Sequence, residues 1–248
     1  MASAKQRVDV LLVERGLAET RARAQAMILA GVVYSGEEKL DKAGRTVAPD
    51  APLVVRGRDH PWVSRGGIKL DHAIAAFAIP IAGRTALDVG ASTGGFTDVL
   101  LARGAARVYA VDVGHGQLAW KLRTDPRVVV LEQTNARHLT RAAVPEPVGL
   151  IVCDASFISL AKVLPAALAL AALGADLVAL IKPQFEAGRA NVGKGGIVRD
   201  PRIHAEVCAA VERWIGAQPG WRTAGVVESP VAGADGNKEF LIAAHHER

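Results

Sequence analysis

Cysteine is scarce in this sequence of 248 residues, with two in total. Cys153 and Cys208 lie far apart and lack paired spacing, so the sequence can build neither a disulfide framework nor a zinc cluster. A reducing compartment is therefore expected. A large excess of charge of one sign is also missing, because the formal net charge is only +5. That value suits a polyanionic partner and suits an ordinary basic protein equally well.

We expect neither a signal peptide nor an uninterrupted membrane span in this sequence. The N-terminus, MASAKQRVDVLLVERG, has charges inside its only apolar stretch and no small-residue cleavage site. The longest apolar run, residues 163–181, is interrupted by Pro165, Gly174 and Asp176. An Asp at mid-membrane costs roughly 2.5 to 3.5 kcal/mol on insertion scales. We expect a cytoplasmic protein without membrane contact, in which this run forms a buried helix, a glycine turn and a short strand.

Half of the residues are apolar and 22% are charged, which permits a buried core. From about residue 84, short apolar runs alternate with longer helical patterns, as in parallel strands joined by crossover helices. Seven expected strands predict a doubly wound, mostly parallel α/β sheet. The strands are expected at residues 85–89, 107–112, 128–131, 149–154, 177–181, 222–229 and 239–244. The helices are expected near residues 95–104, 115–123, 159–173 and 202–216.

The first sixty residues follow a different pattern. VDVLLVERG and TRARAQAMILAG predict two short amphipathic helices, and VVYS and LVVRG (residues 53–57) predict short strands. Four arginines crowd the helices, although this segment has ten basic and eight acidic residues. They could bind a polyanion or simply be a solvated helix surface. We expect a small α+β domain at residues 1–59, a linker at 60–67 and a larger domain at 68–248.

A glycine-rich segment, LDVGASTGGFTD (residues 87–98), lies where the first strand of the sheet should end and its helix begin. Gly90, Gly94 and Gly95 permit close backbone approach to a ligand. The spacing is not GxGxxG, which disfavours a nicotinamide cofactor. Asp112 ends the next strand, where such folds place a ribose acceptor, and Asp88 adds a second carboxylate. These features favour S-adenosylmethionine, and a tight structural turn is the alternative.

Two opposite charges follow buried strands further along the chain. Asp154 ends the run GLIVCD and Lys182 follows LVALI. Because parallel strands end at one edge of the sheet, where ligands bind in open α/β folds, these two side chains are candidates for a functional site. A simple ion pair at the rim of the sheet is the alternative.

Six motifs follow the N-terminal module in order: GASTGGFTD, DVGHGQLAW, DPRVVVLEQTNAR, CDASFISL, LIKPQFE and GKGGIVRDP. On these motifs nearly the whole chain closely resembles the TlyA family of ribosomal RNA 2′-O-methyltransferases. Residues 5–57 resemble an S4-like RNA-binding module, and residues 69–245 resemble the FtsJ-type catalytic domain with its Lys-Asp-Lys-Glu tetrad. The matching positions are Lys69, Asp154, Lys182 and Glu239. At His60-Pro61-Trp62-Val63 the chain departs from the family's Arg-x-Trp-Val linker, so no role of that arginine is carried over.

The resemblance implies a Rossmann-like class I methyltransferase that uses S-adenosylmethionine to methylate ribose, expected to be that of cytidine, in ribosomal RNA within assembled subunits. It implies no metal and no obligate protein partner, and we expect a monomer. The implied cofactor-binding residues are Asp88, Gly90, Ser92, Thr93, Gly94, Gly95, Phe96, Asp112, Asn135, Ala136 and Asp154. The implied RNA-binding residues are Arg7, Arg21, Lys42, Arg65, Arg137 and Lys194.

Two roles remain open for Lys182 in such a reaction. It could remove the proton of the 2′-hydroxyl, which requires burial and Lys69 to favour its neutral form, or it could donate a hydrogen bond that orients the oxygen. Asp154 and Glu239 oppose the first role and would hold both lysines in place. Two other functions are weighed against methyl transfer: a pore-forming haemolysin, and an RNA-binding protein with a degenerate methyltransferase domain.

Overall fold

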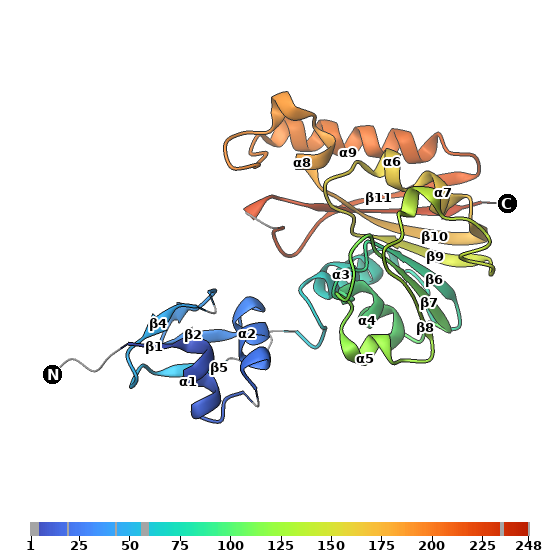
Figure 1. The fold of residues 1–248 in the computed structure, drawn as a ribbon. Coiled ribbons are helices and arrows are strands. Elements are labelled where there is room, and N and C mark those ends of the chain that lie inside the picture. Colours follow the sequence, from blue (N-terminus) through green and yellow to red (C-terminus); the bar gives the residue numbers. More distant parts are fainter. Residues whose placement is uncertain (1–4, 19, 43, 56–59, 234–235, 248) are drawn as a thin grey trace. The chain divides into compact units, whose positions relative to one another are not determined.

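The computed structural model describes residues 5–18, 20–42, 44–55, 60–233 and 236–247. The chain divides into two compact units, residues 1–61 and 62–248 (Figure 1). The expected domain boundary at residue 59 and the last two residues of the expected strand 53–57 lie outside the described residues.

The smaller unit packs two short helices against short antiparallel strands. Strand β2 lies between β3 and β5 in a three-stranded sheet, and β1 pairs with β4. The elements are β1 (Gln6–Arg7), α1 (Val8–Glu14), α2 (Arg21–Leu29), β2 (Val33–Ser35), β3 (Glu38–Lys39), β4 (Thr46–Val47) and β5 (Leu53–Val55).

Apolar residues at helical spacing build the core of this unit. Val8 and Leu12 of α1 and Ile28 of α2 are fully buried in one cluster. Helix α2 begins where the Thr20 hydroxyl accepts a hydrogen bond from the Arg23 backbone N–H at 3.1 Å. Both helices occur where the sequence predicts them, whereas β1, β3 and β4 are each two residues long and too short for a detectable alternation.

The larger unit is built on a seven-stranded sheet in the order β11-β12-β10-β9-β6-β7-β8. The five strands from β10 to β8 are parallel, and β12 lies antiparallel between β10 and β11. The strands are β6 (Thr85–Val89), β7 (Arg107–Val111), β8 (Val128–Leu131), β9 (Val148–Cys153), β10 (Ala171–Ile181), β11 (Trp221–Glu228) and β12 (Phe240–His246). The predicted doubly wound, mostly parallel sheet is confirmed.

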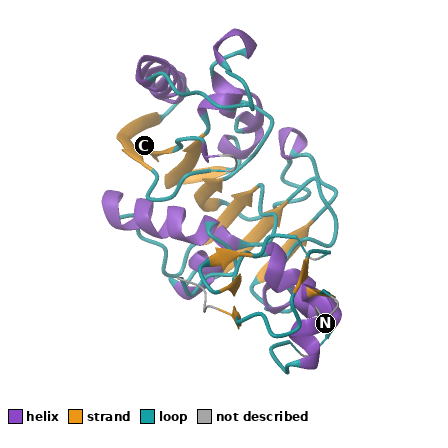
Figure 2. Ribbon diagram, turned by 90° about the vertical axis from the view of Figure 1, so that its left-hand side faces the viewer, coloured by secondary structure: helices purple, strands orange, loops and turns teal. Residues whose placement is uncertain are grey.

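Helices cover both faces of this sheet (Figures 1 and 2). Helices α3, α4 and α5 lie on one face, and α6 to α9 lie on the other (Figure 1). Each layer has its own apolar core, one containing Leu70 of α3 and Phe96 of α4, the other containing Leu160 of α6 and Val207 of α9. The helices are α3 (Gly66–Phe77), α4 (Gly95–Ala102), α5 (Trp120–Arg123), α6 (Leu160–Val163), α7 (Pro165–Leu168), α8 (Pro183–Glu186) and α9 (Pro201–Gly216), with 3₁₀ turns η1 (Ala136–His138) and η2 (Arg189–Asn191).

Two expected helices differ from the structure. Residues 115–119, expected to be helical, form a loop in which Gly116 has a φ of +67°, and only α5 follows it. The expected helix 159–173 is two short helices followed by β10, which already begins at Ala171. Pairing of Ala171 with Val148 of β9 overrides the helical preference of the alanines at the start of β10, and β12 pairs with β10 only from Asp176 onward.

The apolar run at residues 163–181 is therefore divided among the end of α6, α7 and β10. Among the residues that the structure describes, none of the helices has the length and apolarity needed to span a membrane.

Two leucines of strand β10 allow a test of which residues stabilise the fold. Leu180 is 1% exposed inside the core, and Leu173, on the same strand, is 70% exposed. We expect Leu180→Ala to lower the free energy of unfolding by about 2 to 5 kcal/mol because it leaves a cavity. Leu173→Ala should change it by less than about 0.5 kcal/mol. Urea unfolding followed by circular dichroism measures both, and equal losses would contradict this assignment of the core.

Candidate active site

Two adjoining cavities open at the carboxyl edge of the sheet. The larger, of about 790 Å³, lies over the ends of β6, β7 and β9. The smaller, of about 300 Å³, lies between the start of α3 and the ends of β9 and β10. Gly90, Ser92, Asp154 and Ser156 line both cavities, so the two form one continuous site.

The glycine-rich loop forms the wall between β6 and α4. Gly90 has a φ of +85°, and a Cβ there would lie 3.1 Å from the backbone of Asp154 and Ala155. A side chain is therefore excluded by conformation and by space. The next residues turn the backbone toward β7, because the Ser92 N–H donates to Asp112 Oδ2 at 2.9 Å. Thr93 is exposed beside it.

The first turn of α4 is equally crowded. Gly94 caps the helix with a φ of +95°, and a Cβ on Gly95 would lie 2.2 Å from Ser64 Oγ. Phe96 is 3% exposed and lines the smaller cavity. The segment that carries Ser64 is also fixed to α4, because the Val63 N–H donates to Asp98 Oδ2 at 2.8 Å.

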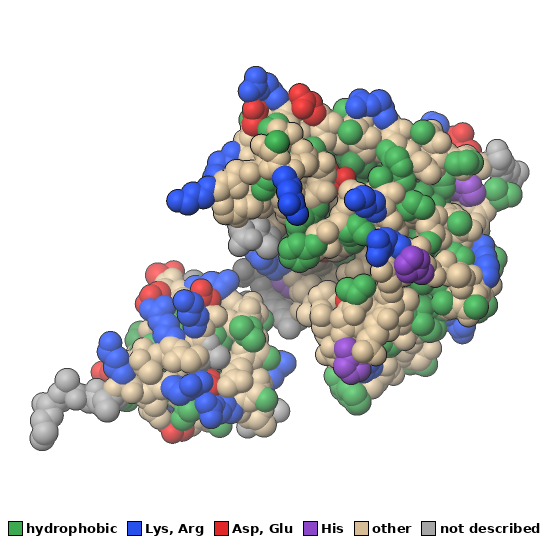
Figure 3. Space-filling view, turned by 45° about the horizontal axis from the view of Figure 1, so that its top comes forward, with side chains coloured by type: hydrophobic (Ala, Val, Ile, Leu, Met, Phe, Trp, Pro, Cys, Tyr) green, Lys and Arg blue, Asp and Glu red, His purple; other side chains and the backbone are tan. Residues whose placement is uncertain are grey.

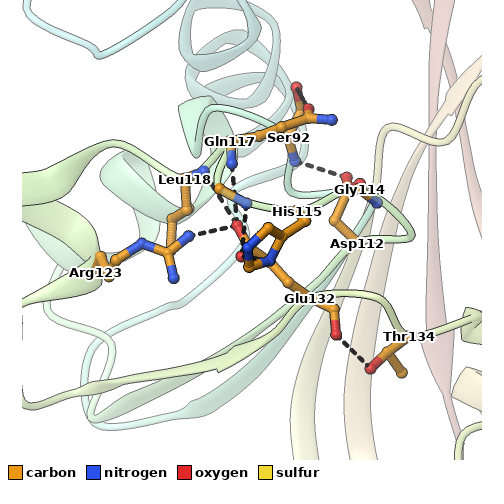
Figure 4. A network of polar contacts seen from close by, with 10 residues as sticks. Ser92, Asp112, Gly114, His115, Gln117, Leu118, Arg123, Glu132 and Thr134 are labelled. Carbon is orange, nitrogen blue, oxygen red and sulfur yellow. Dashed lines mark hydrogen bonds and ion pairs between the residues drawn. The ribbon is translucent and has the colours of Figure 1, made fainter.

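Two carboxylates shape the loop that follows β7 (Figure 4). Asp112 lines the larger cavity, and its Oδ1 accepts the Gly114 N–H at 2.7 Å. Glu132, after β8, accepts the backbone N–H groups of Gly116 at 2.9 Å and Gln117 at 3.1 Å. These contacts, with Arg123 beside them, lower the pKa of Glu132 to about 2. An ionised carboxylate therefore holds this loop in place. No sequence motif indicates the contact, because it joins the ends of two different strands.

The far end of the larger cavity is lined by Asn135 and Ala136 at the start of η1. The Asn135 side-chain oxygen accepts the backbone N–H of Arg137 at 3.1 Å and its Nε–H at 3.2 Å. The amide NH₂ of Asn135 makes no hydrogen bond to any described residue, so it can donate to a ligand.

The four tetrad positions come together as two lysine–carboxylate pairs. Lys69 Nζ of α3 lies 2.5 Å from Glu239 Oε2, before β12. Lys182 Nζ, after β10, lies 2.6 Å from Asp154 Oδ1, after β9, and donates to Ser156 Oγ at 2.7 Å. Both lysines are 8% exposed.

Three of the four tetrad residues, Lys69, Asp154 and Lys182, line the smaller cavity. Glu239 does not, because Gly233 covers it: a Cβ on Gly233 would lie 2.0 Å from Glu239 Oε1. Glu239 therefore acts on the cavity only through Lys69. Within the described residues, no group of three or more His, Cys, Asp or Glu side chains is placed to hold a metal ion.

Asp88 is an expected cofactor residue that, like Gly94, lines neither cavity. It is fully buried beneath the loop and accepts a hydrogen bond from the Thr97 hydroxyl at 2.6 Å. Burial raises its pKa to about 7, and the carboxylates of Asp154 and Asp112 add to the rise.

The expected RNA-binding residues occur in both units. In the larger unit, exposed Arg65 and Arg137 lie at the smaller and the larger cavity, and exposed Lys194 lies in the loop between η2 and α9, outside both. Lys and Arg side chains also gather on the visible face of the smaller unit (Figure 3). There the structure brings Arg7 and Arg21 onto one carboxylate, that of Asp9. Exposed Lys42 begins the turn whose Gly44 lies beside Arg7.

An aromatic pair at the mouth of the site, one ring exposed and the other half-buried, has no counterpart among the sequence predictions. Phe157 is 90% exposed, has a φ of +64°, and its ring centroid lies 5.0 Å from that of Phe185. Both rings line the larger cavity. Nothing in the motif CDASFISL indicates that this phenylalanine leaves the core, because its outward position follows from the left-handed backbone at that residue.

The raised pKa of Asp88 makes a prediction about pH. A buried acid with a raised pKa stabilises the fold below its unfolded value of 3.8, and this contribution is lost as the pH rises through about 7. Relative to Asp88→Asn, the wild-type protein should lose stability between pH 4 and 7, by roughly 4 kcal/mol at most. Denaturant unfolding of both proteins across this range measures it.

Asp125→Asn is the matched control. Arg127 lowers the pKa of Asp125, so the effect of this substitution on stability should change with pH only below about pH 4. An Asp88→Asn effect that is the same at pH 5 and pH 8 would show that Asp88 does not titrate in this range.

Comparison with known proteins matches both units to described families. Residues 62–246 match the FtsJ-like methyltransferase model, and residues 6–52 match the S4 domain model. The 16S/23S rRNA (cytidine-2′-O)-methyltransferase TlyA of Mycobacterium tuberculosis is 52% identical over 96% of this chain and 89% of its own length.

Solved structures agree with this match. A Streptococcus thermophilus structure described as a hemolysin is 42% identical, covers 99% of this chain and 90% of its own, and has a TM-score of 0.77. A Bacillus cereus O-methyltransferase in complex with SAH shares the fold at 20% identity, over 75% of this chain and 83% of its own, with a TM-score of 0.50. The family resemblance predicted from the motifs is confirmed: the chain belongs to the FtsJ-like methyltransferases and, through its relatives, to the TlyA family within them.

Proposed function

We propose that this protein transfers the methyl group of S-adenosylmethionine to the 2′-hydroxyl of a cytidine in ribosomal RNA. The observation that carries the proposal is the arrangement of Lys69, Asp154, Lys182 and Glu239. These residues come from four separate segments and form two ion pairs at a cavity that adjoins the glycine-rich loop. The TlyA relative named above carries out this reaction according to its name.

S-adenosylmethionine suits the larger cavity and the loop beside it. A cavity of about 790 Å³ is large enough for a nucleoside with an amino-acid tail. The bare backbone at Gly90 permits close approach. Asp112, Asn135 and Ala136 line the larger cavity, and we assign Asp112 to the ribose hydroxyls and the other two to the adenine. Bound there, the cofactor supplies an electrophilic methyl group.

The smaller cavity then holds the acceptor ribose. Lys182 Nζ already donates to Ser156 and contacts Asp154, a geometry that suits an ammonium donor, so we assign it the role of orienting the 2′-oxygen toward the methyl group. Asp154 Oδ2 lies toward Gly66 at the wall of this cavity and is placed to take up the proton that the hydroxyl releases. Lys69, held by Glu239, adds positive charge beside the oxygen.

RNA binding is assigned to cations in both units. Arg65 and Arg137 lie at the two cavities, Lys194 extends from a neighbouring loop, and Arg7, Arg21 and Lys42 belong to the S4 domain. Such contacts give salt-dependent affinity and position the substrate without reading sequence. The exposed Phe157 ring offers a surface on which a base displaced from its stack could rest.

We also propose that the substrate is RNA within assembled ribosomal subunits and that the protein acts as a monomer in the cytoplasm. The S4 domain and the relative named as an rRNA methyltransferase support an RNA substrate. In this proposal the domains remain residues 1–59 and 68–248, joined by a linker at 60–67. The name hemolysin, carried by a relative, suggests a different function, but the two lysine–carboxylate pairs, three of whose four residues line the smaller cavity, support group transfer.

Methyl-labelled S-adenosylmethionine and unmodified ribosomal subunits test the proposal directly. Label should enter RNA at a phosphodiester that resists alkaline cleavage, because a methylated 2′-oxygen cannot attack the neighbouring phosphate. Lys182→Ala should lower the single-turnover rate by at least about 100-fold, because the 2′-oxygen loses the donor that orients it. The exposed Lys238, which pairs with Glu228, provides the matched control: Lys238→Ala should keep its rate.

Label on bases would overturn the assignment to ribose, and a near-normal rate for Lys182→Ala would overturn the role given to this lysine. No label on either subunit would favour a non-catalytic RNA-binding protein.

A further inference from the structure

A fully buried carboxylate connects the two helices of the smaller unit. Asp9, in the first turn of α1, has no exposed surface. Its Oδ1 accepts Arg7 Nε–H at 2.9 Å, and its Oδ2 accepts Arg7 Nη2–H at 2.9 Å, Arg21 Nε–H at 2.9 Å and Gln25 Nε2–H at 2.8 Å. Neither the sequence motifs nor the proposed function assigns a role to this residue.

The two arginines on this carboxylate lie next to each other and face solvent. Arg7 Nη2 and Arg21 Nε are both 2.9 Å from the same oxygen, so they cannot be further apart than twice that distance. The side chains of Arg7 and Arg21 are 44% and 56% exposed, whereas that of Asp9 is 0% exposed. The surface therefore presents two positive groups and hides the negative charge that joins them.

Most of the N–H donors of these arginines have no partner among the residues that the structure describes. A guanidinium has five N–H groups; Arg7 uses two of them on Asp9, and Arg21 uses one. Neither guanidinium has another hydrogen-bond partner among the described residues. Free N–H groups of adjacent guanidiniums match the several oxygens of one phosphate group.

Such a pair of arginines is costly to hold without a counter-charge. Two guanidiniums at this separation repel each other, and each long side chain loses rotamer entropy when it is fixed. The Asp9 carboxylate offsets the repulsion and fixes both side chains before any ligand arrives. Its hydrogen bonds to Arg7 hold the pKa of Asp9 far below its ordinary value, so the carboxyl group stays ionised.

We propose that Asp9 is the positioning residue of a two-arginine phosphate site: it holds Arg7 and Arg21 side by side so that together they bind one phosphate of the RNA backbone. The inference rests on the proposed function, in which these arginines contact RNA. Asp9 itself does not touch the RNA and remains bonded to both arginines when RNA binds.

The proposal predicts that Asp9→Asn changes the affinity for RNA in the direction opposite to that expected from net charge alone. Replacing a carboxylate by an amide raises the net charge by one, which by itself should tighten binding to a polyanion. If Asp9 positions the arginines, Asp9→Asn should instead weaken binding, because the two guanidiniums separate.

The test uses the full-length protein and unmodified ribosomal subunits in a salt series. We expect Asp9→Asn to weaken binding about tenfold and to reduce the slope of log Kd against log salt by about one to two, the loss of one or two phosphate contacts. The KM for subunits should rise while kcat at saturating subunits stays unchanged. Glu38→Gln is the matched control, since it makes the same charge change at an exposed ion pair with Arg45, and it should bind as tightly as wild type or more tightly.

Asp9→Asn protein that is folded by circular dichroism and binds as tightly as wild type would overturn the proposal. Arg7→Ala and Arg21→Ala separate the positioning role of Asp9 from the RNA-binding role of the two arginines. If they weaken binding and Asp9→Asn does not, only the positioning role fails; if neither weakens binding, the assignment of these arginines to RNA fails with it.

A measurement on the wild-type protein keeps the proposal testable if Asp9→Asn does not fold. In nitrogen-15 spectra, the Nε–H signals of Arg7 and Arg21 should be protected from exchange in the free protein and should stay protected when a short RNA hairpin is added. Loss of protection on adding RNA would show that the arginines leave Asp9 to reach the phosphate, and the proposal would be wrong.

Discussion

Burying an ammonium group without a counter-charge costs several kcal/mol, and the catalytic unit buries two of them at one edge of its sheet. Each lysine has its own carboxylate: Glu239 for Lys69 and Asp154 for Lys182. This requirement determines much of the surrounding structure. The start of α3 must lie over the sheet, and β12 must run antiparallel beside β10, so that the paired residues meet. The same pairs that make burial tolerable also place positive charge where an acceptor oxygen would lie.

The sheet could be predicted from the sequence because strands covered on both faces leave continuous apolar runs, as in residues 149–154. The prediction failed where local and long-range preferences disagree. Residues 171–173 are two alanines and a leucine, which favour a helix in isolation, yet pairing of Ala171 with Val148 of β9 brings this segment into β10. Residues 115–119 had a helical pattern, but Gly116 and the carboxylate of Glu132 hold them as a loop. Neither the pairing with β9 nor the hydrogen bonds to Glu132 can be detected from the sequence of the segment itself.

The candidate site was likewise only partly predictable from the sequence. Charged residues that directly follow apolar strands, such as Asp154 and Lys182, could be located from the sequence because parallel topology sends them to one edge. Lys69 and Glu239 required the family resemblance, since each lies at the start of an ordinary element. The partners that orient these groups were missed: Ser156 on Lys182, and Asp9 beneath two arginines. Such partners are neighbours only in three dimensions, so no spacing along the chain indicates them.

The two carboxylates beneath the loop after β7 have a consequence for ligand selectivity. Successive backbone N–H groups that point to one spot form a concave anion site, which nucleotide-binding proteins offer to phosphate. Here Glu132 accepts hydrogen bonds from the backbone N–H groups of Gly116 and Gln117, and Asp112 accepts those of Ser92 and Gly114. A phosphorylated nucleotide would find these positions occupied and would face two fixed negative charges. The amides of this loop are therefore closed to an anionic group, because the chain's own carboxylates already accept their hydrogen bonds.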